Sequence, residues 1–270
     1  MVKRKKMSTE RTWKGPKRKN MKVTKAAGTA PKFERSHERF TWKGVLYSDG
    51  QKLFKILPPP RHRRGITVAG SCSWLSVASA LEAANRACGI EVGQLAWEDL
   101  LELVGTEAQC RIGSCLRALK YRGIRTRADY LQGNMEAKRY RISQYTEFCR
   151  PELMDENVVS GLDKDNIKAA IDNALSKSAV ICFFPISDNY YTDFNAGVGN
   201  IYQYDETQTV FMDDGRVATH TAMVTGFGFE EDIPYFQIQD CNGKGFGKKG
   251  FCRILPSSII SIFAFDILQD

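Results

Sequence analysis

The chain has 270 residues, 43% of them hydrophobic and 26% charged, which is typical of a globular protein with one large core or two lobes. The first 40 residues hold 14 Lys and Arg but only 3 Asp and Glu, whereas the rest of the chain holds 25 Lys and Arg and 28 Asp and Glu. The net positive charge therefore belongs to the N-terminal segment. The sequence has no apolar run of the about 20 residues that span a bilayer and no apolar stretch behind the basic N-terminus, which excludes a membrane-spanning protein and a secretory signal.

Residues 1–40 form a basic segment with almost no aliphatic side chains. Such a segment cannot bury enough apolar surface to offset its chain entropy, so we expect a disordered tail followed by a folded domain over residues 41–270. Clusters such as 3–6 and 17–19 are typical of sequences that bind nucleic acid or a nuclear import receptor. The alternative is a solvated tail without a dedicated partner.

The folded part begins with a predicted β-hairpin over residues 42–57, which turns at Ser48-Asp49-Gly50 and stops at Pro58-Pro59-Pro60. The basic run 61–64 then follows as an expected surface loop. This loop precedes Cys72 closely enough in sequence to influence its thiolate.

A helix is predicted over residues 70–88, because apolar residues recur at helical spacing. Ser71 is the expected N-cap and Gly89 the expected C-terminal stop. Cys72 then lies in the first turn, where free backbone N–H groups and the helix dipole favour an anion. A thiol placed there has a lowered pKa and can act as a nucleophile. The alternative is that Cys72 is a small buried core residue.

The remaining elements run from helices to strands along the chain. We expect helices over 92–105, 115–122 and 163–176, and strands over 179–184, 219–229, 235–240 and 251–255. A polar turn over 230–232 joins the second and third of these strands, and a glycine-rich loop precedes the last. Early helices and late antiparallel strands predict an α+β protein with two segregated lobes.

A nucleophilic cysteine requires a base, and the base requires an orienting acceptor. The chain offers only His37, His62 and His220 as imidazoles, of which His37 lies in the tail and His62 in the loop. His220 opens a strand and Asp240 ends the next one, so antiparallel pairing brings them together. Cys72, His220 and Asp240 can therefore form a triad. The alternatives are a His220 satisfied by a backbone carbonyl and an Asp240 that forms a turn.

The eight cysteines are loosely spaced and include no CxxC pair, which with three histidines argues against a zinc site. We expect no metal and no other cofactor. Reduced thiols and the missing signal sequence predict an intracellular protein, cytoplasmic or nuclear.

Several ordered blocks between residues 66 and 255 resemble the papain-like cysteine peptidases. Residues 70–76 with 80–82 resemble the family's Gly-Ser-Cys-Trp-Ala-Phe-Ser…Leu-Glu, and 220–228 match the spacing of its histidine motif. Residues 234–243 resemble Pro-Tyr-Trp-x-Ile-Lys-Asn-Ser-Trp-Gly, and 110–113 resemble Cys-Asn-Gly-Gly. The 148 residues between Cys72 and His220 also fall within the about 130–150 usual for this family.

The resemblance implies the papain-like two-lobe fold, with a helical left lobe and an antiparallel, barrel-like right lobe. It also implies a peptidase that acts on peptide or protein substrates. In it Cys72 is the nucleophile, His220 the base and Asp240 the third residue of the triad, in place of the family's Asn. Gly113 falls on the glycine whose backbone holds the substrate's P2 residue.

Two departures from the family pattern bear on activity. Ile66 stands where the family has its oxyanion-hole Gln, and losing one such donor lowers turnover by about 10²–10³-fold. A rearranged loop that presents Thr67 is one way to compensate. Asn242 stands where the family has a Trp that shields the histidine. The sequence therefore predicts a cysteine peptidase with weakened activity, or alternatively a catalytically degenerate binding scaffold with a basic tail.

Overall fold

The computed structural model describes residues 39–48, 53–66, 68, 70–106, 111–149, 173–175, 177–195 and 200–269. Its helices are α1 (Ser71–Ala87), α2 (Trp97–Val104), α3 (Arg111–Tyr121), α4 (Arg127–Leu131) and α6 (Asn189–Asn195). Its strands are β1 (Phe40–Thr41), β2 (Leu46–Ser48), β3 (Leu53–Lys55), β4 (Ile142–Cys149), β5 (Val180–Pro185), β6 (Ile201–Tyr202), β7 (Thr219–Glu230), β8 (Ile233–Gln239), β9 (Phe251–Ile254) and β10 (Ser261–Ile267).

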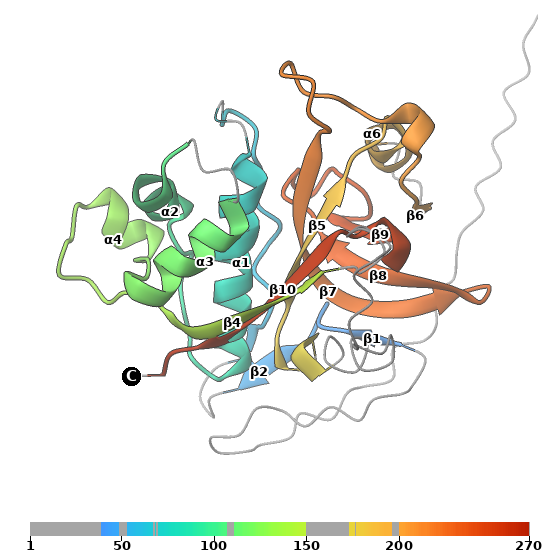
Figure 1. Cartoon of the computed structure of the whole chain (residues 1–270). Coiled ribbons are helices and arrows are strands. Elements are labelled where there is room, and N and C mark those ends of the chain that lie inside the picture. The colour runs from blue at the N-terminus through green and yellow to red at the C-terminus, as the bar shows by residue number, and fades with distance from the viewer. Residues whose placement is uncertain are drawn as a thin grey trace, which may run out of the picture.

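One eight-stranded sheet carries the strand-built half of the molecule. Its order is β4-β10-β5-β7-β8-β9-β6, with β1 paired to β7, and every pair except β6 with β9 is antiparallel. Helices α1 to α4 gather on the other side, and α1 lies against the sheet (Figure 1). The predicted α+β fold with two lobes is therefore confirmed.

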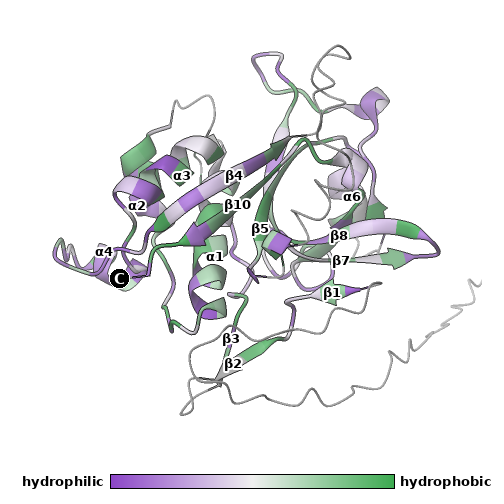
Figure 2. Ribbon diagram, turned by 60° about the horizontal axis from the view of Figure 1, so that its bottom comes forward, coloured by the Kyte–Doolittle hydropathy of each residue, from purple (hydrophilic) through white to green (hydrophobic). Residues whose placement is uncertain are grey.

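Among the described residues, the main hydrophobic cluster runs through both halves, from Trp42 and Trp74 to Phe184 and Tyr202. In Figure 2, β5 is hydrophobic along most of its length, as expected for a strand that lies between β10 and β7. Sixteen of the seventeen residues of α1 are buried, which makes it the central helix on which both lobes pack.

The start of α1 differs from the prediction. Gly70, not Ser71, is the N-cap, and it adopts the left-handed conformation with φ of 76°. Glycine tolerates this conformation because it has no Cβ, so the chain can turn sharply into the helix. Ser71 is consequently the first helical residue and Cys72 the second. At the other end Gly89 has φ of 84°, which confirms the predicted stop.

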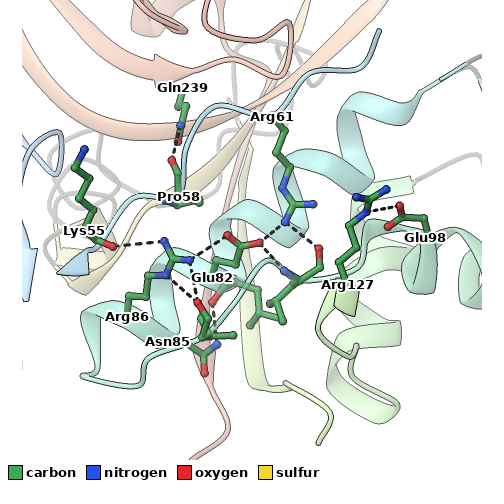
Figure 3. Close-up of polar contacts among 12 residues, drawn as sticks. Lys55, Pro58, Arg61, Glu82, Asn85, Arg86, Glu98, Arg127 and Gln239 are labelled. Carbon is green, nitrogen blue, oxygen red and sulfur yellow. Dashed lines mark hydrogen bonds and ion pairs between the residues drawn. The ribbon is translucent and has the colours of Figure 1, made fainter. Parts of the chain in front are cut away.

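A buried ion pair ties the loop before α1 to the middle of that helix (Figure 3). The Arg61 guanidinium contacts the Glu82 carboxylate and also donates to the Leu95 carbonyl. The same carboxylate accepts the backbone N–H of Leu95 at 2.7 Å and faces Arg86 one turn later. These contacts hold the 61–64 segment against the helix that carries Cys72.

Most of the predicted elements are present. The hairpin strands β2 and β3 pair as expected, while the predicted turn at 49–50 and most of the helix at 163–176 lie outside the described residues. Strands β5, β7, β8 and β9 match within two residues of their predicted bounds. Helix α2 begins five residues later than predicted and α3 four residues earlier. Strands β4 and β10 were not predicted.

The described structure starts at Arg39, and Phe40 already pairs with Phe227 of β7. Residues 1–38 of the predicted tail lie outside the described residues, so their disorder stays a prediction, whereas Phe40 belongs to β1. Within the described part of the chain, no helix is both long enough and apolar enough to cross a membrane.

Candidate active site

Cys72 lies at the N-terminal end of α1, where this helix meets β7. Two hydroxyl groups of α1 bond to a single residue of that strand. Ser76 donates to the carbonyl of Thr221 at 3.0 Å, and the hydroxyls of Ser73 and Thr221 lie 3.1 Å apart. Because Thr221 is adjacent to His220, these bonds set the position of the thiol against the imidazole.

His220 is the second residue of β7 and pairs with Phe184 of β5. Its ring is enclosed by aromatic side chains: the Phe184 ring lies edge-on at 5.5 Å, and the Tyr190 ring lies at the same distance. The side chain is 1% exposed. Strand pairing and ring packing together leave the imidazole one orientation, with Nε2 toward Asp240.

Asp240 follows β8 directly, and its buried carboxylate accepts three hydrogen bonds. Nε2 of His220 lies 2.8 Å from Oδ2, and the hydroxyl of Tyr190 donates to the same oxygen at 2.5 Å. The backbone N–H of Asn242 donates to Oδ1 at 2.6 Å. The predicted neighbourhood of His220 and Asp240 on adjacent strands is therefore present in the structure.

The His220–Asp240 contact has the electrostatics of an ion pair. Burial lowers the pKa of His220, but the charge of Asp240 and its hydrogen bond outweigh burial and raise this pKa well above its ordinary value. Burial raises the pKa of Asp240, and the charge and hydrogen bond of His220 reverse this, so the net pKa is lowered. Imidazolium facing carboxylate is the favoured state at neutral pH.

The thiol of Cys72 is poised to ionise. Burial raises its pKa, but a hydrogen bond and the positive charge of His220, a backbone hydrogen bond of Thr221 and the charge of Arg63 lower it to about 7. A thiolate facing an imidazolium is the nucleophilic state that acyl transfer requires.

A second thiol, that of Cys241, reaches the same imidazole. Cys241, His220 and Asp240 each offer one ligand atom, and these atoms all lie within 4.8 Å of one another. Burial raises the pKa of Cys241 to about 11 despite its hydrogen bond to His220. The two thiols differ because Cys72 lies in the first turn of α1 near Thr221 and Arg63, whereas Cys241 also faces the negative charge of Asp240.

The position of the expected oxyanion donor is apolar. Ile66 packs against the small cluster formed by Cys72, Leu75 and Cys241. Thr67, the possible substitute, lies outside the described residues. Cys72 is the second residue of α1, and the first N–H groups of a helix have no acceptor within it, so the backbone N–H of Cys72 is available as an oxyanion donor.

Arg63 lies beside the proposed triad. The predicted influence of the 61–64 run on the Cys72 thiolate is present at this residue, whose charge lowers the pKa of Cys72, whereas its hydrogen bonds were not predicted. Its backbone N–H donates to the Cys241 carbonyl at 3.0 Å. Its Nε donates to Oδ1 of Asn242 at 2.6 Å, and its Nη2 donates to the hydroxyl of Tyr191 at 3.2 Å. Asn242 thus occupies the place of the family's Trp with a polar contact to a cation.

Gly113 lies in the first turn of α3, in the helical lobe. Backbone N–H groups of a first turn have no acceptor within their helix, so that of Gly113 is of a kind that can bind a substrate carbonyl. Cys110, which precedes it in the motif, lies outside the described residues.

Sequence reasoning missed the roles of Tyr190 and Cys241 and the hydrogen bond between Arg63 and Asn242. The contact between Tyr190 and Asp240 spans 50 residues, and that between Arg63 and Asn242 spans 179. No local pattern encodes such contacts. Only the position of Cys241, directly after Asp240, could have drawn attention to it.

Comparison with known proteins identifies the same fold. The family model described as papain family cysteine protease matches residues 64–261. No curated protein sequence matches the chain. A structure from work on the mite allergens Blo t 1 and Der p 1 aligns with a TM-score of 0.60 and 14% identity, over 87% of this chain and 72% of that chain.

Two further solved structures also align with the chain over most of its length. Digestive procathepsin L2 from Tenebrio molitor aligns with a TM-score of 0.58 and 18% identity, over 86% of this chain and 69% of that chain. The cysteine protease CMS1MS2 of Carica candamarcensis, in complex with E-64, aligns with a TM-score of 0.56 and 16% identity, over 85% of this chain and 98% of that one. At these identities the likeness shows the fold, and it confirms the predicted two-lobe architecture.

Proposed function

Because the chain belongs to the papain family of cysteine proteases, we propose that it hydrolyses peptide bonds with Cys72 as nucleophile, His220 as base and acid, and Asp240 as the orienting acceptor. The observation that carries the proposal is the burial of a single imidazole between a carboxylate at 2.8 Å and a thiol whose pKa lies at about 7. Thiol, imidazole and carboxylate are the three parts of a cysteine-protease triad.

The proposed reaction starts from the thiolate–imidazolium pair. The Cys72 sulfur attacks the substrate carbonyl carbon, and the carbonyl oxygen becomes an oxyanion near the Cys72 N–H. His220 then gives its Nδ1 proton to the leaving amine, the C–N bond breaks, and an acyl-enzyme remains. Water, deprotonated by His220, attacks the thioester and releases the acid product.

Asp240 has two tasks in this scheme. It holds Nε2, so that Nδ1 is the nitrogen that exchanges protons with the thiol and the substrate. It also stabilises the imidazolium, because its charge raises the pKa of His220. Gly113 is the proposed substrate-binding residue, whose backbone N–H would hold a carbonyl of the bound peptide.

The weakness of this site lies in the oxyanion hole. The side chain of Ile66 provides no donor, so at this position of the described site one hydrogen bond to the developing charge is missing relative to the family pattern. We expect turnover about 10²–10³-fold below that of a peptidase with both donors. A scaffold that binds peptides without cleaving them is the second candidate, and the apolar side chain of Ile66 is the observation that favours it.

Mass-mapped labelling with an electrophilic peptide inhibitor at neutral pH separates the two candidates. We expect selective modification of Cys72 in the wild type, a labelling rate at least about 10-fold lower in His220→Ala, and no peptide hydrolysis by Cys72→Ala. Among the described thiols Cys88 is the exposed one, and partial desolvation of its sulfur raises its pKa. Cys88→Ser is therefore the control and should keep the label.

Persistent hydrolysis by Cys72→Ala would contradict the proposed nucleophile. Labelling of Cys88 in preference to Cys72 would contradict the activated thiol and favour the scaffold.

A further inference from the structure

We propose that Arg63 and Asn242 form a carboxylate-binding subsite next to the nucleophile, so that preferred substrates carry a carboxylate on the leaving-group side of the scissile bond. The inference rests on the proposed peptidase function and names the substrate class for it. The carboxylate is either the acidic side chain of the residue after the scissile bond or the free C-terminus of a substrate that ends there.

Arg63 is a cation held in place without a carboxylate partner among the described residues. Its backbone bonds to Cys241, and its guanidinium bonds to the neutral groups of Asn242 and Tyr191. Within the described residues, none of the ion pairs involves Arg63, whereas Arg61 pairs with Glu82 and Arg125 with Asp99. A half-buried guanidinium that lacks an acidic partner is suited to bind one from a ligand.

Asn242 adds a second donor at the same point. Its Oδ1 is used by Arg63, and this leaves Nδ2 buried with no hydrogen-bond partner among the described residues. A buried donor without an acceptor costs free energy in the unliganded protein. A carboxylate can accept from the guanidinium with one oxygen and from the amide with the other, which satisfies both groups at once.

The position of the pair indicates which side of the substrate it contacts. Asn242 donates its N–H to Asp240, and Tyr191 follows Tyr190, which bonds to the same carboxylate. Arg63 therefore lies on the histidine side of the nucleophile. The leaving amine must also lie on this side, because His220 has to protonate it. Gly113, proposed to hold the acyl part, belongs to the helical lobe.

The charge of Arg63 reaches the sulfur itself, since it contributes to lowering the pKa of Cys72. A ligand carboxylate that binds Arg63 will therefore lie within electrostatic range of the reacting atoms. This proximity allows a test that does not require turnover.

The test compares alkylation of Cys72 by iodoacetate and by iodoacetamide, which differ in a carboxylate. The ratio of the two rate constants cancels any change in thiol pKa, because both reagents react with the same thiolate. We expect the rate constant for iodoacetate divided by that for iodoacetamide to fall about 10-fold in Arg63→Gln. This is the factor expected for loss of one charge-assisted hydrogen bond. In the matched control, Arg64→Gln, which removes the exposed neighbouring cation, the ratio should stay within about twofold. An unchanged ratio in Arg63→Gln overturns the subsite.

Peptide substrates then identify the source of the carboxylate. Three matched fluorogenic peptides carry Gln, Glu, or an uncharged residue with a free C-terminus directly after the scissile bond. Wild type should cleave the Glu peptide or the free-acid peptide about 10-fold faster than the Gln peptide, and Arg63→Gln should lose the preference. Equal rates for all three peptides overturn the proposed specificity. If wild type cleaves none of them, the peptidase proposal fails, and the alkylation ratio still decides whether the carboxylate subsite exists.

Discussion

At Asp240 the presence of two carboxylate oxygens, rather than one oxygen and one NH₂ group, decides whether its hydrogen-bond donors are satisfied. The carboxylate faces three donors, from His220, Tyr190 and the backbone of Asn242, and it needs two accepting oxygens to satisfy them. An asparagine amide offers one oxygen and one donor. The donors around residue 240 therefore favour a carboxylate over an amide, although the papain-like motif that this segment resembles has Asn at the same position.

We predict that Asp240→Asn destabilises the protein by about 1–3 kcal/mol, because its NH₂ group must face one of the three donors and leave it unsatisfied. The variant also loses the charge that raises the pKa of His220. The imidazolium will then deprotonate at lower pH, so the alkaline limb of peptide hydrolysis, which needs the imidazolium proton for the leaving amine, moves to lower pH. Urea unfolding and the pH profile of kcat/KM for peptide hydrolysis measure the two effects, and an unshifted alkaline limb of hydrolysis would contradict the role of Asp240.

Ile66 permits a test by gain of function. Replacing it with Gln introduces a donor beside Cys72, in the cluster that Ile66 now contacts. We expect kcat to rise by at least about 10-fold with little change in KM, because the new hydrogen bond forms with the oxyanion and not with the ground state. Ile66→Met, which has no donor, is the control and should bring no gain. An equal kcat in Ile66→Gln and wild type would show that another group already supplies the second donor.

At the scale of elements, helix α2 is fastened by a buried ion pair. Asp99 in its first turn accepts the guanidinium of Arg125 at 2.6 Å and also the backbone N–H of that residue at 2.8 Å. Burial raises the pKa of Asp99, but the hydrogen bonds and charge of Arg125 outweigh it, so the net pKa is lowered. Folding therefore favours the ionised form of this carboxylate.

A carboxyl whose pKa is lowered by folding stabilises the protein above its unfolded-state pKa of 3.8, and this stability is lost as the pH falls through the lower folded-state value. We predict that Asp99→Asn costs about 3–5 kcal/mol at pH 7, since it leaves Arg125 buried without its partner. The free energy of unfolding of this variant should also fall less steeply than that of wild type as the pH is lowered from 7 to 3. Urea unfolding between pH 7 and 3 measures both.

Glu98→Gln is the matched control for this experiment, since Glu98 pairs with the partly exposed side chain of Arg127. Its cost should stay within about 1 kcal/mol. Equal losses in the two variants would contradict the assignment of the stability to the buried pair.

Elements with a strong internal pattern were predictable from the sequence. Strands β5, β7 and β8 combine apolar runs or alternation with clear turn residues, and α1 shows helical spacing over several turns. Strand β4 was missed because polar side chains alternate irregularly along it, and its pairing with β10 joins residues more than 110 positions apart. The N-cap of α1 was placed at Ser71 because propensity favours a hydroxyl, whereas the left-handed turn at Gly70 decides the actual start.

In the site, too, residues that belong to patterned elements were predictable. Cys72, His220 and Asp240 were predictable as candidates because each stands at the end of a patterned element. The sequence placed the basic run 61–64 near Cys72, but no local pattern indicates the contact between Arg63 and Asn242 or that between Tyr190 and Asp240, which form only through folding.

At the scale of the whole molecule, the charge is divided between a tail and a near-neutral domain. With 14 basic and 3 acidic residues in positions 1–40, the tail is proposed to bind nucleic acid. We predict that duplex DNA binding weakens steeply with salt and is lost when residues 1–38 are deleted. This deletion spares Arg39 and Phe40, which belong to the described fold. Fluorescence anisotropy at several salt concentrations measures both.

Replacing the four basic residues at positions 3–6 with Gln is the graded control, and it should reduce the salt slope without abolishing binding. Unchanged affinity after the deletion would assign any nucleic-acid binding to the folded domain.

The order of the sheet also constrains how the protein is made. Strand β10 lies between β4 and β5, although it comes last of all the strands along the chain. During synthesis β4 and β5 leave the ribosome with their facing edges unpaired. More than 70 further residues must be synthesised after β5 before β10, the strand that pairs with both edges, begins. The nascent chain therefore carries two open strand edges, and the sheet can be completed only after translation has passed residue 267.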